Sequence, residues 1–367
     1  MQTIFLSRDD LLGPVQLASG AVERRNTVAI LGNLLLEIRE GTLTVTATDL
    51  EIQISATTAV ATTESLSATV SARKFQEILR ALPDKSEVGL EVGDTKIQVK
   101  SGRSRFSLHT LPAKDYPRLA VQEGPTAEFV LEQKAFKLLL QAVHYSMAHQ
   151  DIRYYLNGLL LTLQGNRLIA VATDGHRLAY SDMPVASDLP ATEVILPRKA
   201  VGEIIRLLGD GPDDVHVRIR PGQVSLEIDK VQFTTKVIDG RFPDFNKVIP
   251  TGYHKTVRLE RNQLLHCLQR VAILSNEKFR GVRWVVVDNT LRILSANAEQ
   301  EEAQEEIPIE FPYAALDIGF NVGYLLDVLN NSKTTQVDFS FGDSGTSMLV
   351  TLPDDDSFKY VVMPMRI

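Results

Sequence analysis

The stretch FLSRDDLLGPVQLAS, residues 5–19, decides the fold because two similar stretches follow it in the chain. These are FVLEQKAFKLLLQAV at 129–143 and VRLERNQLLHCLQRVAIL at 257–274. Matching Leu6 with Leu131 and Leu131 with Leu259 gives spacings of 125 and 128 residues. Self-similarity at a nearly fixed period is the signature of a repeated structural unit. The sequence therefore predicts three copies of one unit.

Each copy begins with a predicted amphipathic helix whose apolar residues recur at i, i+4 and i+7. These residues are Leu11, Val15 and Ala18, then Phe136, Leu140 and Val143, then Leu264, Leu268 and Val271. A second helix is predicted later in each copy from the i, i+3, i+4, i+7 pattern. Its residues are Phe75, Ile78, Leu79 and Leu82, then Val201, Ile204, Ile205 and Leu208, then Val322, Leu325, Leu326 and Leu329. In the first copy Ser71 is a candidate N-cap, and Pro83 would stop the helix.

Alternating, β-rich runs lie between and after the predicted helices. LTVTATDLEIQI (43–54), LIAVATDGHRLAY (168–180) and LRILSANAEQEEAQ (291–304) align at Ala47, Ala172 and Ala296. Each copy closes on a strand, and these strands align at Phe106, Phe233 and Tyr360. Gly and Pro interrupt the pattern near 122–126 and 250–253. We predict an α+β fold of three tandem domains, residues 1–124, 127–250 and 252–367, each with two helices packed on β-sheets.

The composition limits the class of protein. One cysteine, Cys267, excludes a disulfide framework and a multi-cysteine zinc site within the chain, and its apolar helix favours a packing role. The N-terminus lacks a signal-peptide pattern, and the longest apolar runs are strand-sized. We therefore expect a cytoplasmic protein with no membrane partner. The net charge of −7 argues mildly against nucleic acid, but most of the acidic excess lies in the third copy, much of it in AEQEEAQEEIPIE (298–310).

Motifs of catalysis and cofactor binding are absent from the sequence. It contains no GxxxxGK[ST], no strand-to-helix GxGxxG, no HExxH and no GxSxG. The seven histidines show no metal-ligand spacing with acidic partners. We therefore expect no cofactor, no metal and no catalytic residue.

The segment ATDGHRLAY (172–180) is the one stretch that looks catalytic, because Asp174, His176 and Arg177 surround a glycine. Its counterparts, ATDLEIQI and ANAEQEEA, share a strand followed by a tight turn, so Asp174 and Gly175 are predicted to be turn residues. GHRL is particular to the middle copy, which leaves room for a function confined to that copy. An enzyme that uses Asp174 and His176 is one alternative. A sequence-specific DNA regulator is disfavoured, since no recognition-helix motif is visible.

Several segments suggest binding. ARKF and PRKA place Arg73–Lys74 and Arg198–Lys199 at helix N-termini, where positive charge opposes the helix dipole. This arrangement suggests an anionic partner, although solvated surface side chains explain it equally well. HQDIRYYLNG (149–158) combines arginine for phosphate with tyrosines for stacking. The C-terminal YVVMPMRI is either a terminal strand or an adaptable apolar surface for peptides.

The segments SGRSRFSLHTLP, MAHQDIRYYLNG, ATDGHRLA, DGRFPDF, ILSNEKFRGVR, IGFNVGYLLDVLN and YVVMPMRI, together with the three-copy organisation, resemble the β sliding clamp of bacterial DNA polymerase III, of the proteobacterial type. The resemblance runs from end to end. It implies a non-catalytic processivity factor that forms a closed, ring-shaped, head-to-tail homodimer around duplex DNA without reading its sequence. It also implies loading by a clamp loader complex. Linear peptide motifs would bring the replicative polymerase alpha subunit, translesion polymerases, mismatch-repair proteins and ligase to one pocket.

The resemblance assigns residues to three sites. DNA contacts map onto Arg25, Gln150, Arg153, Tyr154, Tyr155 and Lys199, and the helix argument adds Arg73 and Lys74. The peptide pocket maps onto Leu156, Thr173, Gly175, His176, Arg177, Leu178, Pro243, Lys247, Val248, Ser347, Val361, Val362, Met363, Pro364, Met365 and Arg366. Lys247 replaces an arginine common in relatives, and Gly345 replaces an apolar residue.

At the dimer interface, the resemblance pairs Phe106 of one copy of the chain with Ile273 and Leu274 of another. The charge distribution adds a complement to this apolar contact. Basic residues Lys100, Arg103 and Arg105 would face the acidic residues Glu299, Glu301, Glu302, Glu305 and Glu306.

Overall fold

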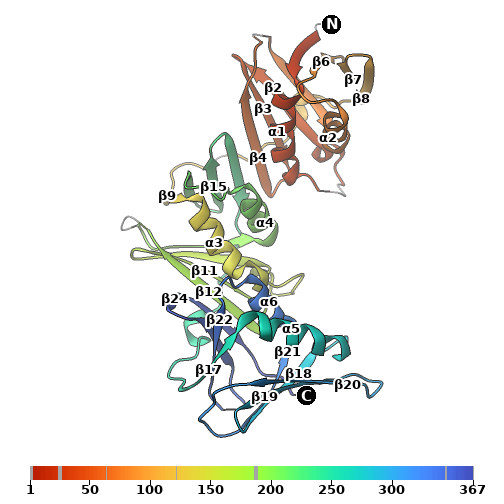
Figure 1. Ribbon diagram of the computed structural model, residues 1–367. Helices are drawn as coiled ribbons and strands as arrows, with labels where there is room; N and C mark the ends of the chain where they lie inside the picture. Colours follow the sequence, from red (N-terminus) through yellow and green to blue (C-terminus); the bar gives the residue numbers. More distant parts are fainter. Residues whose placement is uncertain are drawn as a thin grey trace. The chain divides into compact units, whose positions relative to one another are not determined.

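A computed structural model describes residues 3–23, 27–62, 64–120, 122–185, 189–343 and 345–366 (Figure 1). The chain forms two compact units, Met1–Lys137 with Gly202–Val237 and Leu138–Val201 with Ile238–Ile367. The middle copy of the repeat contributes to both units. The three copies of the repeat are therefore distributed over two units.

The first unit contains the whole first copy and half of the second. Its elements are β1 (Thr3–Ser7), α1 (Arg8–Ala18), β2 (Asn33–Arg39), β3 (Thr42–Thr48), β4 (Ile52–Ala59), β5 (Leu66–Ser71), α2 (Ala72–Ala81), β6 (Glu87–Val92), β7 (Lys96–Ser101), β8 (Ser104–His109), β9 (Ala127–Glu132), β14 (Asp214–Arg220), β15 (Gln223–Ile228) and β16 (Val231–Lys236). Helices α3 (Gln133–Val143) and α4 (Arg198–Leu207) run from one unit into the other.

The second unit contains the other half of the second copy and the third. Its elements are β10 (Gly158–Gln164), β11 (Arg167–Thr173), β12 (Arg177–Pro184), β13 (Thr192–Pro197), β17 (Lys255–Glu260), α5 (Arg261–Val271), β18 (Gly281–Val287), β19 (Thr290–Ala296), β20 (Glu302–Pro308), β21 (Leu316–Asn321), α6 (Val322–Asn331), β22 (Gln336–Phe341), β23 (Met348–Leu352) and β24 (Asp355–Val362). Short 3-10 helices are η1 (Ser19–Ala21), η2 (Ala29–Gly32), η3 (Ala113–Asp115), η4 (His144–Ser146), η5 (Tyr154–Leu156), η6 (Phe245–Lys247) and η7 (Ala272–Leu274).

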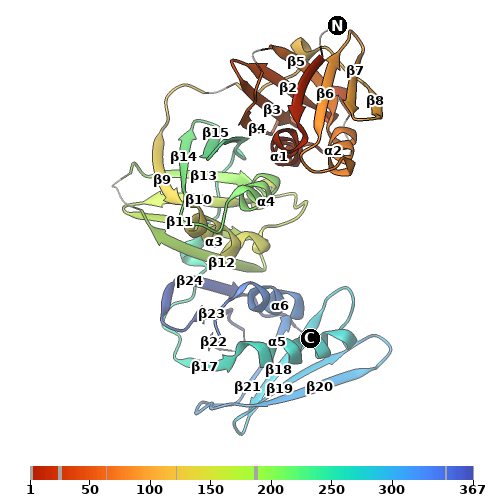
Figure 2. The ribbon, with the colours of Figure 1, turned by 45° about the horizontal axis from the view of Figure 1, so that its top comes forward.

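Each copy of the repeat has the same strand topology. In the first copy one sheet runs β1-β6-β7-β8 and another runs β5-β2-β3-β4. The corresponding orders are β9-β14-β15-β16 and β13-β10-β11-β12 in the second copy, and β17-β22-β23-β24 and β21-β18-β19-β20 in the third. Figure 2 shows the two helices of the first copy, α1 and α2, side by side, and α5 and α6 side by side in the third. The helices α1 to α6 lie where the periodicity predicts them.

The predicted helix faces form the core. All nine residues of the first-helix pattern are buried, as are Phe75 and Leu79 of α2. Ser71 stands at the N-cap of α2, but its side chain makes no capping hydrogen bond, whereas Ser7 Oγ caps α1 by accepting from the Asp9 N–H. The interior strand residues and the helix faces thus bury one another, as alternating and 3.6-residue patterns require.

Neighbouring copies join edge to edge into continuous eight-stranded sheets. At the first junction β4 pairs with β16, and at the second junction β12 pairs with β24, both antiparallel. The corresponding strands β8 in the first copy and β20 in the third pair on one side only among the described strands. Each junction uses the same two strand positions of the repeat, so β8 and β20 are the two edges that the pattern leaves open.

The predicted match of Ala296 with Ala47 and Ala172 is wrong by one residue. Ala47 and Ala172 are fully buried and pair with residues seven positions later, Ile54 and Ala179. In the third copy the buried residue is Ser295, which pairs with Ala303, eight positions later, while Ala296 is exposed. The turn after β19 is therefore one residue longer, and matching identical letters across it moved the alignment to the neighbouring alanine.

Candidate functional site

The turn at 173–177 is built by side chains that cap backbone groups. The Thr173 hydroxyl donates to the Arg177 carbonyl at 2.5 Å and accepts from the Gly175 N–H at 3.1 Å. One Asp174 carboxylate oxygen accepts the N–H groups of His176 and Arg177 at 2.9 and 3.1 Å. The other accepts from Arg177 Nε at 3.1 Å. Both carboxylate oxygens are therefore occupied by the turn and by arginine, and neither forms a dyad with the His176 ring.

The first copy contains the same turn. Thr48 and Asp49 make the equivalent hydrogen bonds, including Asp49 Oδ1 to the N–H of Ile52 at 2.7 Å. The positive-φ position is Leu50 (φ 78°) in the first copy and Gly175 (φ 90°) in the second. The prediction that Asp174 and Gly175 are turn residues is confirmed. A Cβ at 175 would also lie 2.9 Å from the Arg153 guanidinium nitrogens, so a side chain there would displace the end of the Arg153 side chain.

Arg177 leaves the turn inward and is nearly buried, with 9% of its side chain exposed. Its Nη1 lies 2.5 Å from Asp327 Oδ2, and its Nη2 donates to the Tyr145 carbonyl at 2.7 Å. The guanidinium carbon lies 4.6 Å from the centre of the Tyr324 ring, a cation–π contact. Burial lowers the pKa of Arg177, but Tyr360, Asp327 and Asp174 outweigh it and hold the pKa above its usual range. Arg177 is thus a structural link across the second junction as well as a neighbour of the pocket.

The floor of the candidate pocket is apolar and spans the second junction. Leu178 on β12 pairs with Val361 on β24, and both belong to one buried cluster with Leu156, Phe242 and Phe245. Thr173 is buried beside Leu178. Val362 is also buried, but alternation along β24 directs it to the opposite face of the sheet. The sequence therefore brings together residues that lie about 180 positions apart.

The rim of the pocket is exposed and includes large apolar side chains. Val248 is 43% exposed and Met363 is 48% exposed. Pro243 and His176 are exposed, and Lys247 forms an exposed ion pair with Asp244 at 3.2 Å. Isolated exposed apolar residues are ordinary, but apolar rim residues above an apolar floor suit a peptide side chain.

The C-terminal segment is tied down. The Met363 N–H donates to the His176 carbonyl, and Met365 N–H donates to the Gly319 carbonyl, each at 2.9 Å. Pro364 is half-buried and Arg366 is exposed. On the other side, the Ser347 carbonyl accepts from the Tyr253 hydroxyl at 2.7 Å, near the exposed Gly345. Residues 363–365 are therefore held in place beyond the end of β24 by His176 on one side and Gly319 on the other.

A polar loop adjoins the pocket turn. Arg153 holds Asp151 through two hydrogen bonds, Nε to Oδ1 at 3.0 Å and Nη2 to Oδ2 at 2.9 Å, and Nη2 also donates to the Asp174 carbonyl at 3.2 Å. These bonds lower the pKa of Asp151 to about 2. Tyr154 is 58% exposed, whereas Tyr155 packs against the apolar cluster. Gln150 is exposed with φ 56°. The predicted DNA contacts of the middle copy and the pocket turn thus share Arg153.

The other predicted DNA contacts are spread over two helices. Arg73 pairs with Glu77 at 2.9 Å, and Lys74 is exposed, both in the first turns of α2. Lys199 stands in the first turn of α4 and is half-buried, next to Arg198, which donates to the Met147 carbonyl. Arg25 lies outside the described residues.

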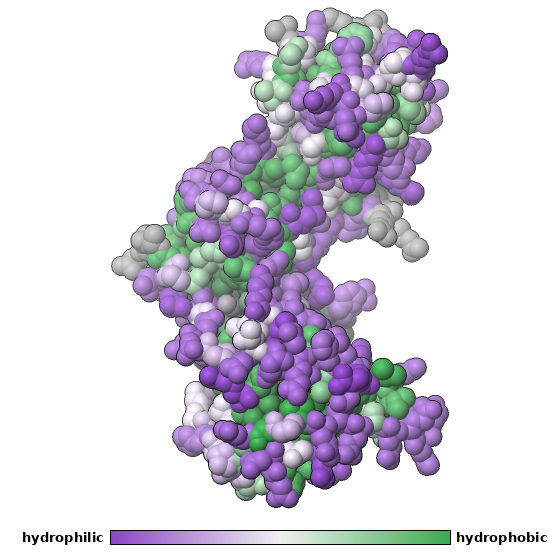
Figure 3. Space-filling model, viewed as in Figure 1, coloured by the Kyte–Doolittle hydropathy of each residue, from purple (hydrophilic) through white to green (hydrophobic). Residues whose placement is uncertain are grey.

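The predicted interface residues cluster at the open edges. On β8, Phe106 is half-buried and pairs with Val99 of β7. Arg105 on β8 and Arg103 just before it make no hydrogen bond or ion pair with the described residues, while Lys100 on β7 pairs with Glu91. In the third copy Ile273 is 78% exposed and Leu274 is half-buried. On and near β20, Arg270 holds Glu305 and lowers its pKa, Arg292 pairs with Glu306, and Asn297 bonds Glu301. Glu299 and Glu302 are exposed. Figure 3 shows apolar, green atoms at the surface beside the outer end of β20.

Two kinds of site are absent from the described part of the chain. Its His, Cys, Asp and Glu side chains form no group of three that could hold a metal ion. No described helix is long and apolar enough to cross a membrane. Cys267 is buried, as its helix pattern predicts.

Comparison with known families gives matches along the whole chain. The DNA polymerase III beta subunit models match in order: the N-terminal domain at residues 2–120, the central domain at 130–244 and the C-terminal domain at 246–366. The beta sliding clamp of Escherichia coli K12 is 45% identical over 363 residues, 99% of each chain. That of Pseudomonas aeruginosa PAO1 is 42% identical over 367 residues, again 99% of each.

Solved structures agree in fold. A Pseudomonas aeruginosa DnaN sliding clamp bound to griselimycin has a TM-score of 0.95 at 41% identity, covering 100% of this chain and 99% of the other. Caulobacter crescentus pol III beta has a TM-score of 0.94 at 34% identity, covering 100% of both chains.

The matches and the three-copy fold define a DNA sliding clamp, and the chain belongs to the DNA polymerase III beta subunit family. Its function is that of a non-catalytic processivity factor, which tethers a polymerase to DNA through a peptide-binding region. The predicted α+β class with three tandem clamp domains is confirmed, and the enzyme alternative is wrong.

Some residues of the site escaped the sequence analysis. Tyr145, Tyr324 and Asp327 hold Arg177, and they come from η4 and α6, which are far apart in the sequence. No local pattern joins them. Phe242 and Phe245 of the floor could have been predicted from the sequence. They lie in a polar segment that contains Gly and Pro and has no helix or strand pattern, so two aromatic side chains there are expected to pack against another part of the chain.

Proposed function

We propose that two copies of the chain join head to tail into a closed ring around duplex DNA, each contributing clamp domains 1–124, 127–250 and 252–367. The open edges β8 and β20 carry the proposal. They are the same two repeat positions that pair at both internal junctions, and each lacks a partner strand within the described chain. An unpaired sheet edge is a template for another strand, and a head-to-tail contact closes when the rotation permits.

The internal junctions predict the register of this contact. At the first junction Phe233 pairs with Ile54, which pairs with Ala47 on its other side. At the second junction Tyr360 pairs with Ala179, which pairs with Ala172 on its other side. Because Ser295 occupies that position in the third copy and faces Ala303, Phe106 of one subunit should lie opposite Ala303 of the other. The antiparallel pairing then sets Arg105 opposite Gln304 and Arg103 opposite Glu306. Arg105 falls diagonally between Glu302 and Glu306, so the charges are complementary.

The junctions also predict the apolar contact. At the second junction Tyr145 of η4 packs against Tyr360, with ring centres 5.8 Å apart. The equivalents of these two residues are Ile273 of η7 and Phe106, which supports the pairing drawn from the resemblance. At the first junction the equivalent residue of η1, Gly20, lies against Glu203 and Arg206 of α4. The matching positions of α2 are Glu77 and Arg80, so α2 would complete the seat for Ile273.

Sedimentation of the Ile273→Ala, Leu274→Ala double variant tests the ring. We expect monomers, because the exposed apolar contact is lost while both side chains lie outside the core. Leu111→Ala, which removes another exposed apolar side chain (36% exposed) from the loop after β8, serves as the control and should remain dimeric. An unchanged dimer in the double variant contradicts the proposed interface.

We further propose that the pocket formed by the residues assigned above, from Leu156 to Arg366, binds linear peptides of the replicative polymerase alpha subunit, translesion polymerases, mismatch-repair proteins, ligase and the clamp loader complex. Its apolar floor at Leu178 and Val361 and its exposed rim at Val248 and Met363 support this use. Because the rim lysine Lys247 is already paired with Asp244, it should add little to affinity. The cytoplasm, where bacterial DNA is replicated, is the proposed location.

The DNA contacts that we propose are few and electrostatic. They comprise Arg25, Arg73, Lys74, Gln150, Arg153, Tyr154, Tyr155 and Lys199. A clamp that slides needs contacts that ignore base sequence, and such contacts weaken as counterions compete. Binding to a short linear duplex should therefore fall steeply between low and physiological salt, measured by fluorescence anisotropy on two unrelated sequences. Salt-insensitive or sequence-dependent binding contradicts the proposal.

A further inference from the structure

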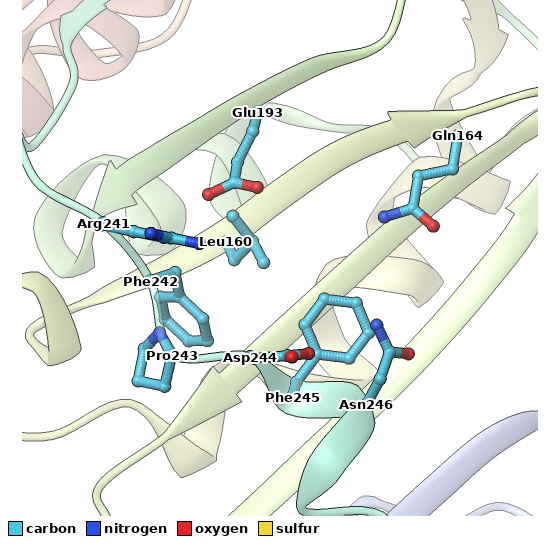
Figure 4. A pocket seen from close by; sticks show the side chains of 9 residues that line it. All are labelled: Leu160, Gln164, Glu193, Arg241, Phe242, Pro243, Asp244, Phe245 and Asn246. Carbon is cyan, nitrogen blue, oxygen red and sulfur yellow. The ribbon is translucent and has the colours of Figure 1, made fainter.

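A second hollow lies beside residues 241–246, on the sheet face that carries Leu178 and Val361 of the proposed peptide pocket (Figure 4). It has a volume of about 180 Å³ and is lined by Leu160, Gln164, Glu193, Arg241, Phe242, Pro243, Asp244, Phe245 and Asn246. All of these belong to the second unit. Pro243 is also one of the residues assigned to the peptide pocket, so the two hollows meet at that residue.

The two hollows share one floor. Leu178 pairs with Val361, and two residues further along β12, Tyr180 pairs with Val171 of β11. Val171 pairs with Leu160, and side chains opposite each other or two apart lie on one face of a sheet. Leu160 is therefore on the face that carries Leu178. Leu160, Phe242 and Phe245 are each no more than 6% exposed and belong to the same buried cluster as Leu178 and Val361.

The rim of the second hollow carries polar groups without partners. Four exposed side chains make no hydrogen bond or ion pair with the rest of the described chain: those of Gln164, Glu193, Arg241 and Asn246. In Figure 4 the ends of Arg241 and Glu193 point toward the same space above Leu160. An unpaired guanidinium offers a two-pronged donor for a carboxylate, and the two carboxamides offer donors and acceptors that suit a peptide backbone.

The strand under the rim also has an unused edge. β13 is the outer strand of its sheet, and its Ile195 carbonyl accepts from the Ile238 N–H at 2.9 Å on the side away from β10. Glu193, two residues earlier, directs its backbone groups to the same side, where no described residue pairs with them. A bound peptide would find one free backbone donor and one free acceptor there.

From these observations we infer that the hollow is a second subsite for the partner peptide. It takes an apolar side chain over Leu160 and Phe245 and an acidic side chain on Arg241. This rests on the proposed peptide pocket and extends it past Pro243. Val361 on β24 and Leu160 on β10 are three strand spacings apart, roughly 14 Å at about 4.8 Å per spacing. About four extended residues cover that distance, so a partner needs its two apolar anchors about four residues apart.

The first experiment selects random 20-residue peptides, displayed on phage, on the full-length protein. The inference predicts an enrichment of peptides with two apolar anchors about four residues apart and an acidic residue beside one of them. One enriched peptide is then made with a fluorescein label, in full and without the second anchor, and both forms are titrated by fluorescence anisotropy.

The full peptide should bind the wild-type protein about tenfold more tightly than the truncated one, in the range of a buried aromatic or arginine contact. Arg241→Glu should remove this gain without weakening the truncated peptide. Lys333→Glu, the same charge change at another exposed, unpartnered residue of the second unit, should keep the gain. Replacing the peptide's acidic residue by lysine should restore the gain on Arg241→Glu, which a folding defect does not produce.

Equal binding of the full and truncated peptides to the wild-type protein overturns the second subsite alone. The second subsite is also overturned if the Arg241→Glu variant binds the full peptide as tightly as the wild-type protein does. Failure of every peptide to bind, including the truncated one, overturns the proposed peptide pocket itself and with it the second subsite.

Discussion

The two internal junctions pair the same strands of the repeat but are reinforced very differently. At the first junction Arg206 of α4 donates to the Leu17 carbonyl at 2.8 Å and pairs with Glu203, and its side chain is 39% exposed. At the second junction Arg177 is nearly buried between two carboxylates, a backbone carbonyl and an aromatic ring. In the described part of the chain the first junction therefore adds only exposed polar contacts to its strand pairing, whereas the second adds a nearly buried network.

The additional contacts of the second junction accompany the peptide pocket. Arg177 follows directly on the turn at 173–176 and precedes Leu178 of the pocket floor, so whatever fixes Arg177 also fixes both. The first copy has the same turn without an arginine at this position, since Ile52 stands there. Because the first copy forms the same turn without this arginine, the network around Arg177 is not needed to form the turn, and it adds a buried link between the two copies at the second junction.

The largest expected effect comes from removing the two arginines. Arg177→Ala leaves Asp327, Asp174 and the Tyr145 carbonyl without their shared donor. Removing one partner of such a buried ion-pair network lowers the free energy of unfolding by about 3 kcal/mol. Arg206→Ala removes an exposed group and should cost less than about 1 kcal/mol. Urea unfolding followed by circular dichroism compares the two, and fluorescence of the single tryptophan, buried Trp284, follows the third copy. Equal losses for both variants would break the contrast between the junctions.

A smaller effect is expected at the left-handed position of the two turns. Gly175→Ala places a Cβ in a strained conformation and against Arg153, and should cost about 1–2 kcal/mol. Leu50→Gly in the first copy relieves the same strain and should stabilise by less than about 1 kcal/mol, because the unfolded chain also gains freedom. Thermal unfolding measures the loss of stability in Gly175→Ala and the gain in Leu50→Gly. Peptide binding should weaken in Gly175→Ala and stay unchanged in Leu50→Gly.

The smallest effect concerns the pH dependence of the polar loop. Asp151 has a pKa of about 2 in the folded protein against an ordinary value of 3.8, because Arg153 donates to its carboxylate. Its stabilising contribution is therefore complete above pH 3.8 and is lost as the pH falls through about 2. Carbon-detected NMR titration of the Asp151 carboxyl should show this midpoint.

The control for this titration is Arg153→Ala, in which the Asp151 midpoint should rise toward 3.8. A midpoint that is the same in both proteins would mean that Arg153 is not held by Asp151 in solution. Arg153 would then be free for DNA from the outset, and the link between the DNA loop and the pocket turn would be lost.

Much of the fold follows from the sequence because its helices are amphipathic and recur. Leu11, Phe136 and Leu264 occupy one repeated position, and each is buried as the pattern predicts. The alignment failed where the pattern is weakest, at the turn after β19. An extra residue there shifts Ser295 into the buried position, and a run of glutamates offers no hydrophobic periodicity to correct the register.

The site is less predictable because it is assembled across long sequence distances. Local turn chemistry identified Asp174 and Gly175, since an Asx turn depends only on neighbouring residues. The position of Arg177 beside Asp327 depends on how β12 meets β24, a pairing that no local pattern encodes. The residues of the pocket therefore came from the family resemblance, and their roles remain predictions.

The charges on the two open edges have a consequence for the direction of assembly. β20 carries Glu302 and Glu306 on its exposed side, so a second β20 beside it would meet like charge. Arg105 on β8 and Arg103 in the turn before it give the opposite edge positive charge, so two β8 strands would repel as well. Like charges therefore disfavour the pairing of either edge with its own copy, and opposite charges favour the pairing of β8 with β20. In the proposed ring every subunit then points the same way, which would give the ring two different sides and allow a partner to tell one from the other.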